Sequence, residues 1–208
     1  MLLFIFDMDE VLYRYDWRTR MAALSREVGL SVDELKARWW HDTGERAAEA
    51  GAWTTSSDYL AAFEAAIGRR VDEQAWVAAR ASAMEPIPAS LDAVRLAARL
   101  GRVTLLTNNG ALTAHHLPTI APHLVELFGD HLHTTSDYRA RKPDPVVFER
   151  VLEAYGVDAT DAFFADDLVE NVAAAESVGI TGHVFTTGEE MSTAITEFAR
   201  ARPGDERA

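Results

Sequence analysis

The first dozen residues hold a short apolar run that ends in acidic positions. Residues 1–6 are Met, Leu, Leu, Phe, Ile and Phe, with no alternation between apolar and polar positions. Such a run of branched and aromatic residues is typical of a β-strand that is buried on both faces. Asp7 and Asp9 follow it directly. The pattern therefore predicts a central strand with two carboxylates at its carboxyl end.

The stretch behind this strand changes to the helical spacing of apolar positions. Gly29 and Gly68 are placed as helix stops, and Ser31 with Glu34 forms a capping box. Nothing between residues 13 and 85 has the pattern of a strand, and Pro86 and Pro88 mark a boundary. The sequence therefore predicts a helical insert over residues 14–86. Five helices are expected in it, at residues 17–28, 31–41, 46–50, 57–67 and 72–84.

From residue 90 onward, apolar strands alternate with amphipathic helices. This alternation predicts an α/β fold with a doubly wound, Rossmann-like parallel sheet. Residues 1–13 and 87–200 would form this core, and residues 201–208, rich in charge with Pro and Gly, are expected to be a disordered tail. Strands are expected at residues 102–106, 131–135, 162–165 and 181–185. Helices are expected at residues 91–100, 111–120, 124–128, 146–155, 169–178 and 189–199.

Composition narrows the range of partners and compartments. The 208 residues carry a formal net charge of −13, which argues against nucleic acid or an anionic membrane as a partner. There is no cysteine, so disulfides and thiolate metal sites are excluded. The N-terminus lacks the features of a signal peptide, and no apolar run approaches the ~20 residues that span a bilayer. A cytoplasmic protein is expected.

Polar side chains follow three of the predicted strands. Because the carboxyl ends of parallel strands lie on one edge of a sheet, these groups can meet there. Several carboxylates at one edge repel each other unless a hard cation such as Mg²⁺ lies among them. Such a site suits phosphoryl transfer, which depends on charge neutralisation and positioning. The residues concerned are Asp7 and Asp9, Thr107 and Asn108, Asp166 and Asp167, and Lys142 in a proline-flanked loop.

Four segments together resemble the motifs of the haloacid dehalogenase-like hydrolases. They occur in the family's order and cover essentially the whole chain. The helical insert resembles that of the subgroup with an α-helical cap, and the Asp166-Asp167 pair resembles the sugar-phosphate phosphatases of this subgroup. The segments are residues 6–11 (FDMDEV), 106–108 (LTN), 141–143 (RKP), and 164–167 (FADD) followed by Asn171.

The resemblance implies a role for each motif residue. Asp7 would be the nucleophile that forms an aspartyl-phosphate. Asp9 would be the general acid and base, and Lys142 would pair with Asp7 and with the phosphate.

The resemblance also implies the ligands of the metal and of the phosphoryl group. Mg²⁺ would be held by the Asp7 side chain, the Asp9 backbone carbonyl and Asp166. The Thr107 hydroxyl and the Asn108 backbone N–H would bind the phosphoryl oxygens, aided by the following helix N-terminus.

The roles of several further positions follow from their neighbourhood, and Asp167 has two interpretations. Asp167 either supports or binds the metal, or it caps the following helix. Asn171 is expected to be a structural hydrogen-bond donor rather than a ligand. Glu10 departs from the glycine that the family often has there, and its charge near the site mouth is expected to affect substrate choice. His115 and His116 are expected at the surface or in packing.

All five tryptophans fall in the helical insert. They either form an aromatic roof over the substrate or fill the core of a small helical unit. The packing interpretation is favoured for most of them, whereas the adjacent pair Trp39-Trp40 cannot both face inward on one helix. The five are Trp17, Trp39, Trp40, Trp53 and Trp76.

The leading hypothesis is a magnesium-dependent phosphatase for a small phosphorylated metabolite, a sugar phosphate or a similar phosphomonoester. A phosphoglucomutase-type transfer shares the same core residues and stays open. A haloacid dehalogenase needs no magnesium and typically lacks the second aspartate, so Asp9 argues against it. Retention of all four motifs argues against a non-catalytic binding module. The sequence does not reveal the substrate or the oligomeric state.

Overall fold

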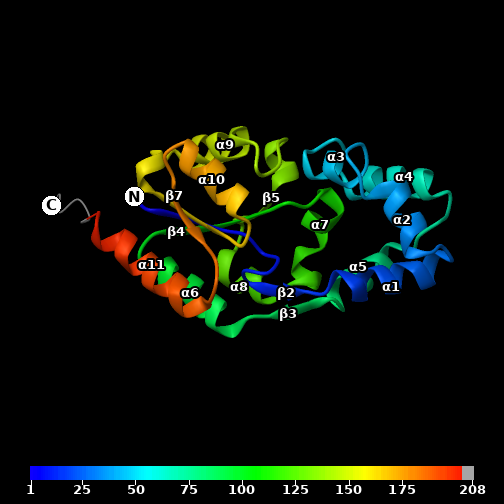
Figure 1. Cartoon of the computed structure of the whole chain (residues 1–208), viewed down its shortest axis with the longest axis horizontal. Helices are drawn as coiled ribbons and strands as arrows, with labels where there is room; N and C mark the ends of the chain where they lie inside the picture. Colours follow the sequence, from blue (N-terminus) through cyan, green and yellow to red (C-terminus); the bar gives the residue numbers. More distant parts are fainter. Residues whose placement is uncertain (203–208) are drawn as a thin grey trace.

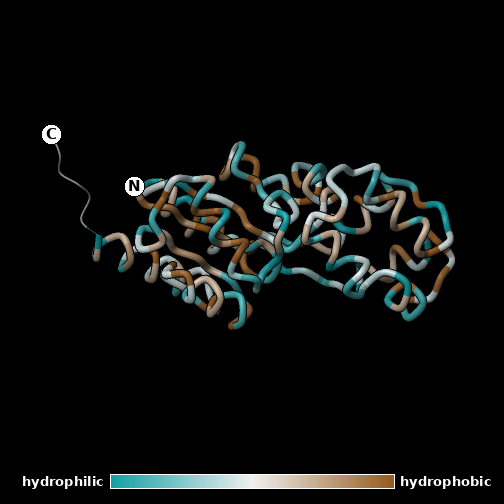
Figure 2. Tube along the Cα trace, turned by 90° about the horizontal axis from the view of Figure 1, so that it is seen from above, coloured by the Kyte–Doolittle hydropathy of each residue, from teal (hydrophilic) through white to brown (hydrophobic). Residues whose placement is uncertain are grey.

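The chain folds into a larger and a smaller lobe (Figures 1 and 2), in a computed structural model that describes residues 1–202. The larger lobe holds a five-stranded parallel sheet in the order β5-β4-β1-β6-β7, which confirms the predicted doubly wound α/β fold. The predicted disordered tail lies, from residue 203 on, outside the described residues. The strands are β1 (Leu3–Phe6), β4 (Arg102–Thr107), β5 (Leu132–Thr134), β6 (Ala162–Asp166) and β7 (Thr181–Val184).

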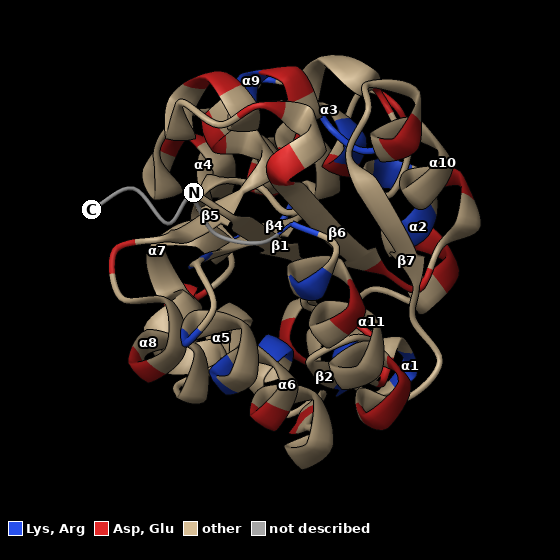
Figure 3. Ribbon diagram, turned by 90° about the vertical axis from the view of Figure 1, so that its left-hand side faces the viewer, with Lys and Arg blue, Asp and Glu red and all other residues tan. Residues whose placement is uncertain are grey.

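Helices cover both faces of the sheet because its central strand is apolar on both sides. Phe4 and Phe6 pack on one face, and Leu3 and Ile5 on the other, all fully buried. Figure 3 shows α9 and α10 on one side of the sheet and α6, α8 and α11 on the other. No helix among residues 1–202 has the length and apolarity needed to cross a membrane. The core helices are α6 (Pro88–Ala98), α7 (Ala111–Ile120), α8 (His123–Phe128), α9 (Pro145–Tyr155), α10 (Val169–Ser177) and α11 (Gly188–Arg200).

The smaller lobe, called the cap below, is formed by the helices between Trp17 and Ala81. Its helix ends follow the local signals of the sequence. Gly29 ends α1 in the left-handed conformation, and Ser31 and Glu34 form the predicted capping box of α2. The cap helices are α1 (Trp17–Val28), α2 (Val32–Trp39), α3 (Glu45–Glu49), α4 (Ser56–Ile67) and α5 (Glu73–Ala81).

A two-stranded antiparallel ribbon connects the cap to the core. It pairs β2 (Tyr13–Tyr15) with β3 (Met84–Pro86), so the expectation of no strand between residues 13 and 85 is wrong. For the same reason α5 ends at Ala81 and not near residue 84. Each strand has three residues, too few for an alternating pattern, and the partner lies about 70 residues away in the chain. A pattern search along the sequence therefore has no signal for this ribbon.

Tryptophans form much of the cap core. Trp39 and Trp76 are buried, and the Trp39 ring stacks on Trp53 at 5.2 Å and meets Phe63 edge-on at 5.3 Å. These contacts support the packing interpretation for Trp39 and Trp76. Trp40 is only partly buried and is the C-cap of α2, which ends at Trp39 and so two residues before the predicted end.

The cap is seated on helix α7 of the core, which α4 and α5 contact. Gly110, at the N-cap of α7, lies directly under it. A Cβ atom at Gly110 would lie 3.0 Å from the Ala48 side chain and 3.1 Å from the Tyr59 ring. Only glycine permits this close approach without displacement of a neighbour.

A partly buried contact between Arg141 and Glu49 joins the cap to the core. The Arg141 Nε donates to a Glu49 carboxylate oxygen at 2.7 Å, and the Thr135 hydroxyl donates to the Glu49 carbonyl at 2.9 Å. The Glu49 side chain is only 14% exposed. Burial, and then the neighbouring Glu45, raise the pKa of Glu49 to about 7, although Arg141 opposes the shift.

We expect Glu49 to make folding stability depend on pH. Its pKa is about 7 in the folded protein and about 4.3 in an unfolded chain, so the folded state keeps a proton that the unfolded state has lost. The stabilising contribution is fully present below the unfolded value and is lost as pH rises through 7. At about 1.4 kcal/mol per pKa unit this amounts to at most roughly 4 kcal/mol.

Thermal unfolding between pH 5 and 8 checks this expectation. The wild-type midpoint should fall, relative to that of Glu49→Gln, as pH rises through 7. Glu153→Gln, an exposed substitution of the same kind in α9, should follow the wild type. Parallel curves for the wild type and Glu49→Gln would show that Glu49 keeps an ordinary pKa.

Candidate active site at the carboxyl edge of the sheet

The sheet order brings three sequence-distant polar groups to one place. β1 lies between β4 and β6, in parallel with both, and Phe6 is in register with Leu105 and Ala165. Asp7, Thr107 and Asp166 therefore stand together at the carboxyl ends of neighbouring strands. The Asp7 backbone N–H also donates to the Ala165 carbonyl at 3.0 Å, which extends the β1–β6 pairing to the first carboxylate.

Lys142 lies between two of the carboxylates and is itself buried. Its Nζ is 3.0 Å from Asp7 Oδ1 and 2.6 Å from Asp166 Oδ2. The predicted contact between Lys142 and Asp7 is present, and the contact with Asp166 is an addition that the motifs alone did not indicate. Although burial alone would lower it, the two carboxylates raise the pKa of Lys142 above its usual value. The ammonium group is therefore charged at neutral pH.

The carboxylates outnumber this one ammonium group. Asp7, Asp166 and Asp167 offer oxygen atoms that all lie within 4.8 Å of one another. Burial raises the pKa of Asp7 to about 7, with Asp166 and Asp9 adding to the rise and Lys142 opposing it. Burial, followed by Asp166, raises the pKa of Asp167 to about 6. Three carboxylates, two of them buried, beside one ammonium group fit a divalent cation with oxygen ligands.

Two asparagines hold this group in place. The Asn108 side chain donates to the Lys142 carbonyl at 3.0 Å and accepts from the Lys142 backbone N–H at 2.9 Å. The Asn171 amide donates to both Asp166 oxygens at 3.0 and 3.1 Å, and the Leu168 backbone N–H donates to Asp166 Oδ1 at 2.9 Å. Asn171 is thus a hydrogen-bond donor to a carboxylate, the role expected for it. The use of the Asn108 side chain was not expected.

The loop after β4 places a hydroxyl beside the carboxylates. Thr107 is buried, and its hydroxyl oxygen accepts a hydrogen bond from the Asn109 amide at 2.9 Å. The hydroxyl hydrogen therefore has to point to another acceptor. Asn109 and Gly110 lead into the N-terminus of α7, where backbone N–H groups favour an anion. The sequence marks Asn109 only as a turn residue.

The Asp9 carboxylate is turned toward the cap. Both of its oxygens lie 2.7 Å from Arg80 Nη2, and Arg80 belongs to α5. Sequence reasoning missed Arg80, because 71 residues separate it from Asp9 and no motif contains it. Asp9 is 27% exposed, so it remains accessible on its other side.

Glu10 has a structural role in the turn after Asp9. Its backbone is left-handed, with φ of +60°, a conformation for which glycine is the usual residue. Its carboxylate accepts a hydrogen bond from the Tyr15 backbone N–H at 2.8 Å. This bond compensates for the strained backbone and ties the turn to β2.

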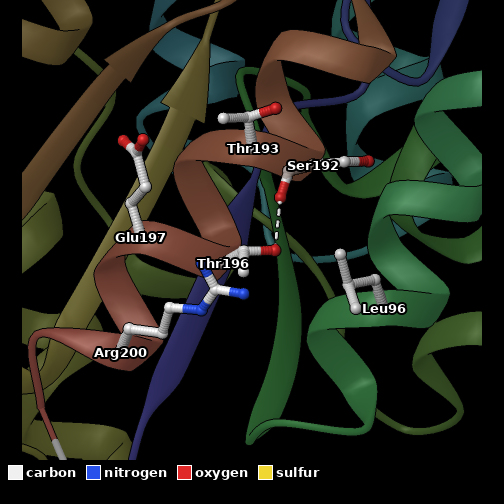
Figure 4. Close-up of a pocket in the computed structure, with 6 residues that line it drawn as sticks. All are labelled: Leu96, Ser192, Thr193, Thr196, Glu197 and Arg200. Atoms are coloured by element: carbon white, nitrogen blue, oxygen red, sulfur yellow. Dashed lines mark hydrogen bonds between the residues drawn. The ribbon is translucent and has the colours of Figure 1, made fainter.

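Two surface hollows are lined by residues that do not belong to the acidic group of the site. One, of about 290 Å³, lies between α6 and α11 and contains Ser192, Glu197 and Arg200 (Figure 4); the Thr196 hydroxyl in it donates to the Ser192 carbonyl at 2.9 Å. The other lies where the cap meets α7 and has a volume of about 570 Å³. Hydroxyl and charged side chains line it. They come from Thr54, Thr55, Ser56, Ser57, Glu73, His115 and Asp137.

His116, one of the two adjacent histidines, connects α7 to the cap. His116 Nε2 lies 2.7 Å from a Glu73 carboxylate oxygen, so it contacts the cap. His115 lines the neighbouring hollow. The expected packing role fits His116, with an acidic partner that lies 43 residues away in the sequence.

Comparisons with known proteins agree with this geometry. Phosphatase MT3486 of Mycobacterium tuberculosis (strain CDC 1551 / Oshkosh) is 27% identical over 186 residues, which cover 86% of this chain and 85% of that protein. A predicted HAD-like hydrolase of Porphyromonas gingivalis has a similar structure, with a TM-score of 0.77 and 20% identity over 96% of this chain and 98% of its own.

A second solved structure has the same fold. It is the HAD family enzyme bt-2542 of Bacteroides thetaiotaomicron, in complex with magnesium and inorganic phosphate. The TM-score is 0.71 at 21% identity, covering 90% of this chain and 96% of that one.

The family itself is shown by sequence. The family model described as a hydrolase, "haloacid dehalogenase-like hydrolase", matches residues 1–179, which include every residue of the site described above. The chain therefore belongs to the haloacid dehalogenase-like hydrolases.

Proposed function

We propose that this protein is a magnesium-dependent phosphatase that hydrolyses a small phosphomonoester through an aspartyl-phosphate. The observation that carries the proposal is the buried Lys142 between Asp7 and Asp166, with Asp167 completing the acidic group. Such a site offers a nucleophile together with the positive charge that a phosphoryl group needs. The named activity of phosphatase MT3486, and the magnesium and phosphate bound to bt-2542, support the proposal.

The reaction begins with Asp7. One of its carboxylate oxygens attacks phosphorus while the bond from phosphorus to the ester oxygen breaks. Asp9 gives its proton to the departing oxygen, so that an alcohol leaves. In the second step Asp9 takes a proton from water, whose oxygen attacks the aspartyl-phosphate. Inorganic phosphate is released, and Asp7 and Asp9 return to their starting states.

Positive charge and hydrogen bonds hold the phosphoryl group during both steps. Lys142 offsets the charge of Asp7 and of the phosphoryl oxygens. The Thr107 hydroxyl and the Asn108 backbone N–H donate to those oxygens, next to the N-terminus of α7. The side chain of Asn108 holds Lys142 in position through two hydrogen bonds to the Lys142 backbone.

Asp7, Asp166 and the backbone carbonyl of Asp9 would hold Mg²⁺, with Asp167 as a further oxygen donor. When bound, the ion supplies charge neutralisation to the phosphoryl oxygens. We infer a sugar phosphate or a similar small ester as substrate, because the Asp166-Asp167 pair resembles the sugar-phosphate phosphatases. The seating of the cap on α7 supports a small substrate.

Replacement of the nucleophile tests the central assignment. Asp7→Asn should lower turnover of p-nitrophenyl phosphate by at least ~10³-fold, because an amide cannot form the phosphoryl intermediate. Steady-state kinetics measure this, and circular dichroism checks the fold. Asp92→Asn, an exposed substitution of the same kind in α6, is the control and should keep wild-type turnover. Substantial turnover by Asp7→Asn would remove Asp7 from the role of nucleophile.

Metal removal tests the acidic group. EDTA should abolish activity and Mg²⁺ should restore it, whereas Asp167→Asn should need a higher Mg²⁺ concentration for half-maximal rate. Because ligands must be deprotonated to bind a metal and the pKa of Asp7 is about 7, Mg²⁺ affinity should fall as pH drops below 7. Calorimetric titration at pH 6 and 8 measures this. Turnover that is unaffected by EDTA would contradict the metal assignment.

Phosphorus NMR distinguishes hydrolysis from phosphoryl transfer within one molecule. With a hexose 1-phosphate as substrate, we expect the ester signal to be replaced by that of inorganic phosphate. Appearance of a hexose 6-phosphate signal without inorganic phosphate would identify a mutase. A reaction with Asp7→Asn serves as the control for spontaneous hydrolysis.

A further inference from the structure

We propose that Arg80 is a positioning residue that places the Asp9 carboxylate for proton transfer while the cap is seated on the core. The inference rests on the proposed role of Asp9 as general acid and base. It adds a residue from the cap, outside all four motifs, to the residues on which the chemical step depends.

The contact between Arg80 and Asp9 is short and buried on the arginine side. Arg80 Nη2 lies 2.7 Å from both Asp9 oxygens, and the Arg80 side chain is 1% exposed. The guanidinium also lies 3.8 Å over the centre of the Tyr15 ring, which belongs to β2 of the connecting ribbon. Arg80 thus belongs to α5 and also packs against β2, and these two elements together place its guanidinium beside Asp9.

Arg80 and Asp9 belong to different lobes. Asp9 follows β1 in the core and forms a backbone bridge with Tyr13, whereas Arg80 stands in the last turn of α5. Any displacement of α5 relative to β1 moves the guanidinium relative to the carboxylate. The orientation of Asp9 thus depends on the position of the cap.

The geometry of the pair is not the one that favours stability. An arginine usually binds a carboxylate through two nitrogen atoms, but here both oxygens contact the same nitrogen. Arg80 Nε and Nη1 are buried without a hydrogen-bond partner among the described residues. A buried charge with unpaired donors costs free energy that an apolar side chain would avoid. This cost argues for a functional reason to keep Arg80.

A contact through one nitrogen suits a carboxylate that has to turn. Asp9 can rotate toward a leaving group and keep one of its two contacts with Nη2, because both start from the same atom. Its other side is accessible, since the side chain is 27% exposed. Arg80 therefore restricts where the carboxylate lies without blocking it.

The leaving group of the substrate provides a selective test. An alkoxide leaves poorly and needs a proton in the transition state, whereas p-nitrophenolate leaves without one. General acid catalysis contributes about 10²–10⁴-fold where it is needed. Loss of Asp9 positioning should therefore slow the first step, in which the leaving group departs, much more for alkyl esters than for p-nitrophenyl phosphate.

The experiment compares kcat/KM of the full chain with Mg²⁺ on p-nitrophenyl phosphate and on glycerol 2-phosphate. This ratio reports the steps up to departure of the leaving group and omits the hydrolysis of the aspartyl-phosphate, which both esters share. Arg80→Gln should lower kcat/KM for glycerol 2-phosphate by about a hundredfold and that for p-nitrophenyl phosphate by less than about tenfold. Arg80→Lys should recover part of the loss on the alkyl ester. In an Asp9→Asn background, Arg80→Gln should have little further effect on kcat/KM.

Arg20→Gln is the matched structural control. Arg20 is also a buried cap arginine, with two nitrogens that have no hydrogen-bond partner within residues 1–202, but it contacts the Tyr15 hydroxyl and the Trp40 and Trp76 rings and not Asp9. Its substitution should change both esters by the same factor. If Arg80→Gln fails to fold, Arg80→Lys carries the same test, with a smaller but still selective loss.

Equal losses on both esters for the Arg80 variants would overturn the inference, and so would unchanged kinetics. An additive effect of Arg80→Gln in the Asp9→Asn background would also overturn it. These outcomes differ from failure of the proposed function, in which the wild-type protein hydrolyses neither ester or Asp7→Asn keeps full activity.

Discussion

The ammonium group of Lys142, buried between the carboxylates of Asp7 and Asp166, is the contact on which the site depends. Without it, the carboxyl ends of β1 and β6 would place two unneutralised charges side by side in a desolvated position, a large free-energy cost. With it, the two carboxylates can be held at 3.0 and 2.6 Å from a common cation. The order of strands in the sheet, with β1 beside β6, is what makes this geometry available.

The features that could be predicted from the sequence are those with a local physical cause. The unbroken apolar run of residues 3–6 indicated a strand buried on both faces, and the structure places it at the centre of the sheet. Gly29 and the Ser31 capping box fixed helix ends to within a residue or two, because caps depend on neighbouring backbone groups. The carboxyl ends of parallel strands share one edge by geometry, so Asp7, Thr107 and Asp166 could be grouped before their positions were known.

The features that could not be predicted are contacts between distant residues without a motif. The ribbon of β2 and β3 pairs two three-residue segments about 70 residues apart, and its pairing depends on how the cap returns to the core. Arg80 is one of several arginines in the cap, and nothing in its neighbourhood distinguishes it from Arg38 or Arg46. Asn108 was expected to act through its backbone, whereas its side chain holds Lys142; a side chain that bonds a distant backbone has no local signature.

Two of the contacts between the lobes, Glu49 with Arg141 and Arg80 with Asp9, constrain the cap in different ways. Glu49 binds Arg141, the neighbour of Lys142, and Arg80 binds Asp9 itself. The position of the cap is thus coupled to Asp9 and to the loop that carries Lys142, which are different segments of the core. A change of substrate that requires the cap to sit differently would disturb both contacts together. Only substitutions that leave α3 and the last turn of α5 in place would keep both contacts.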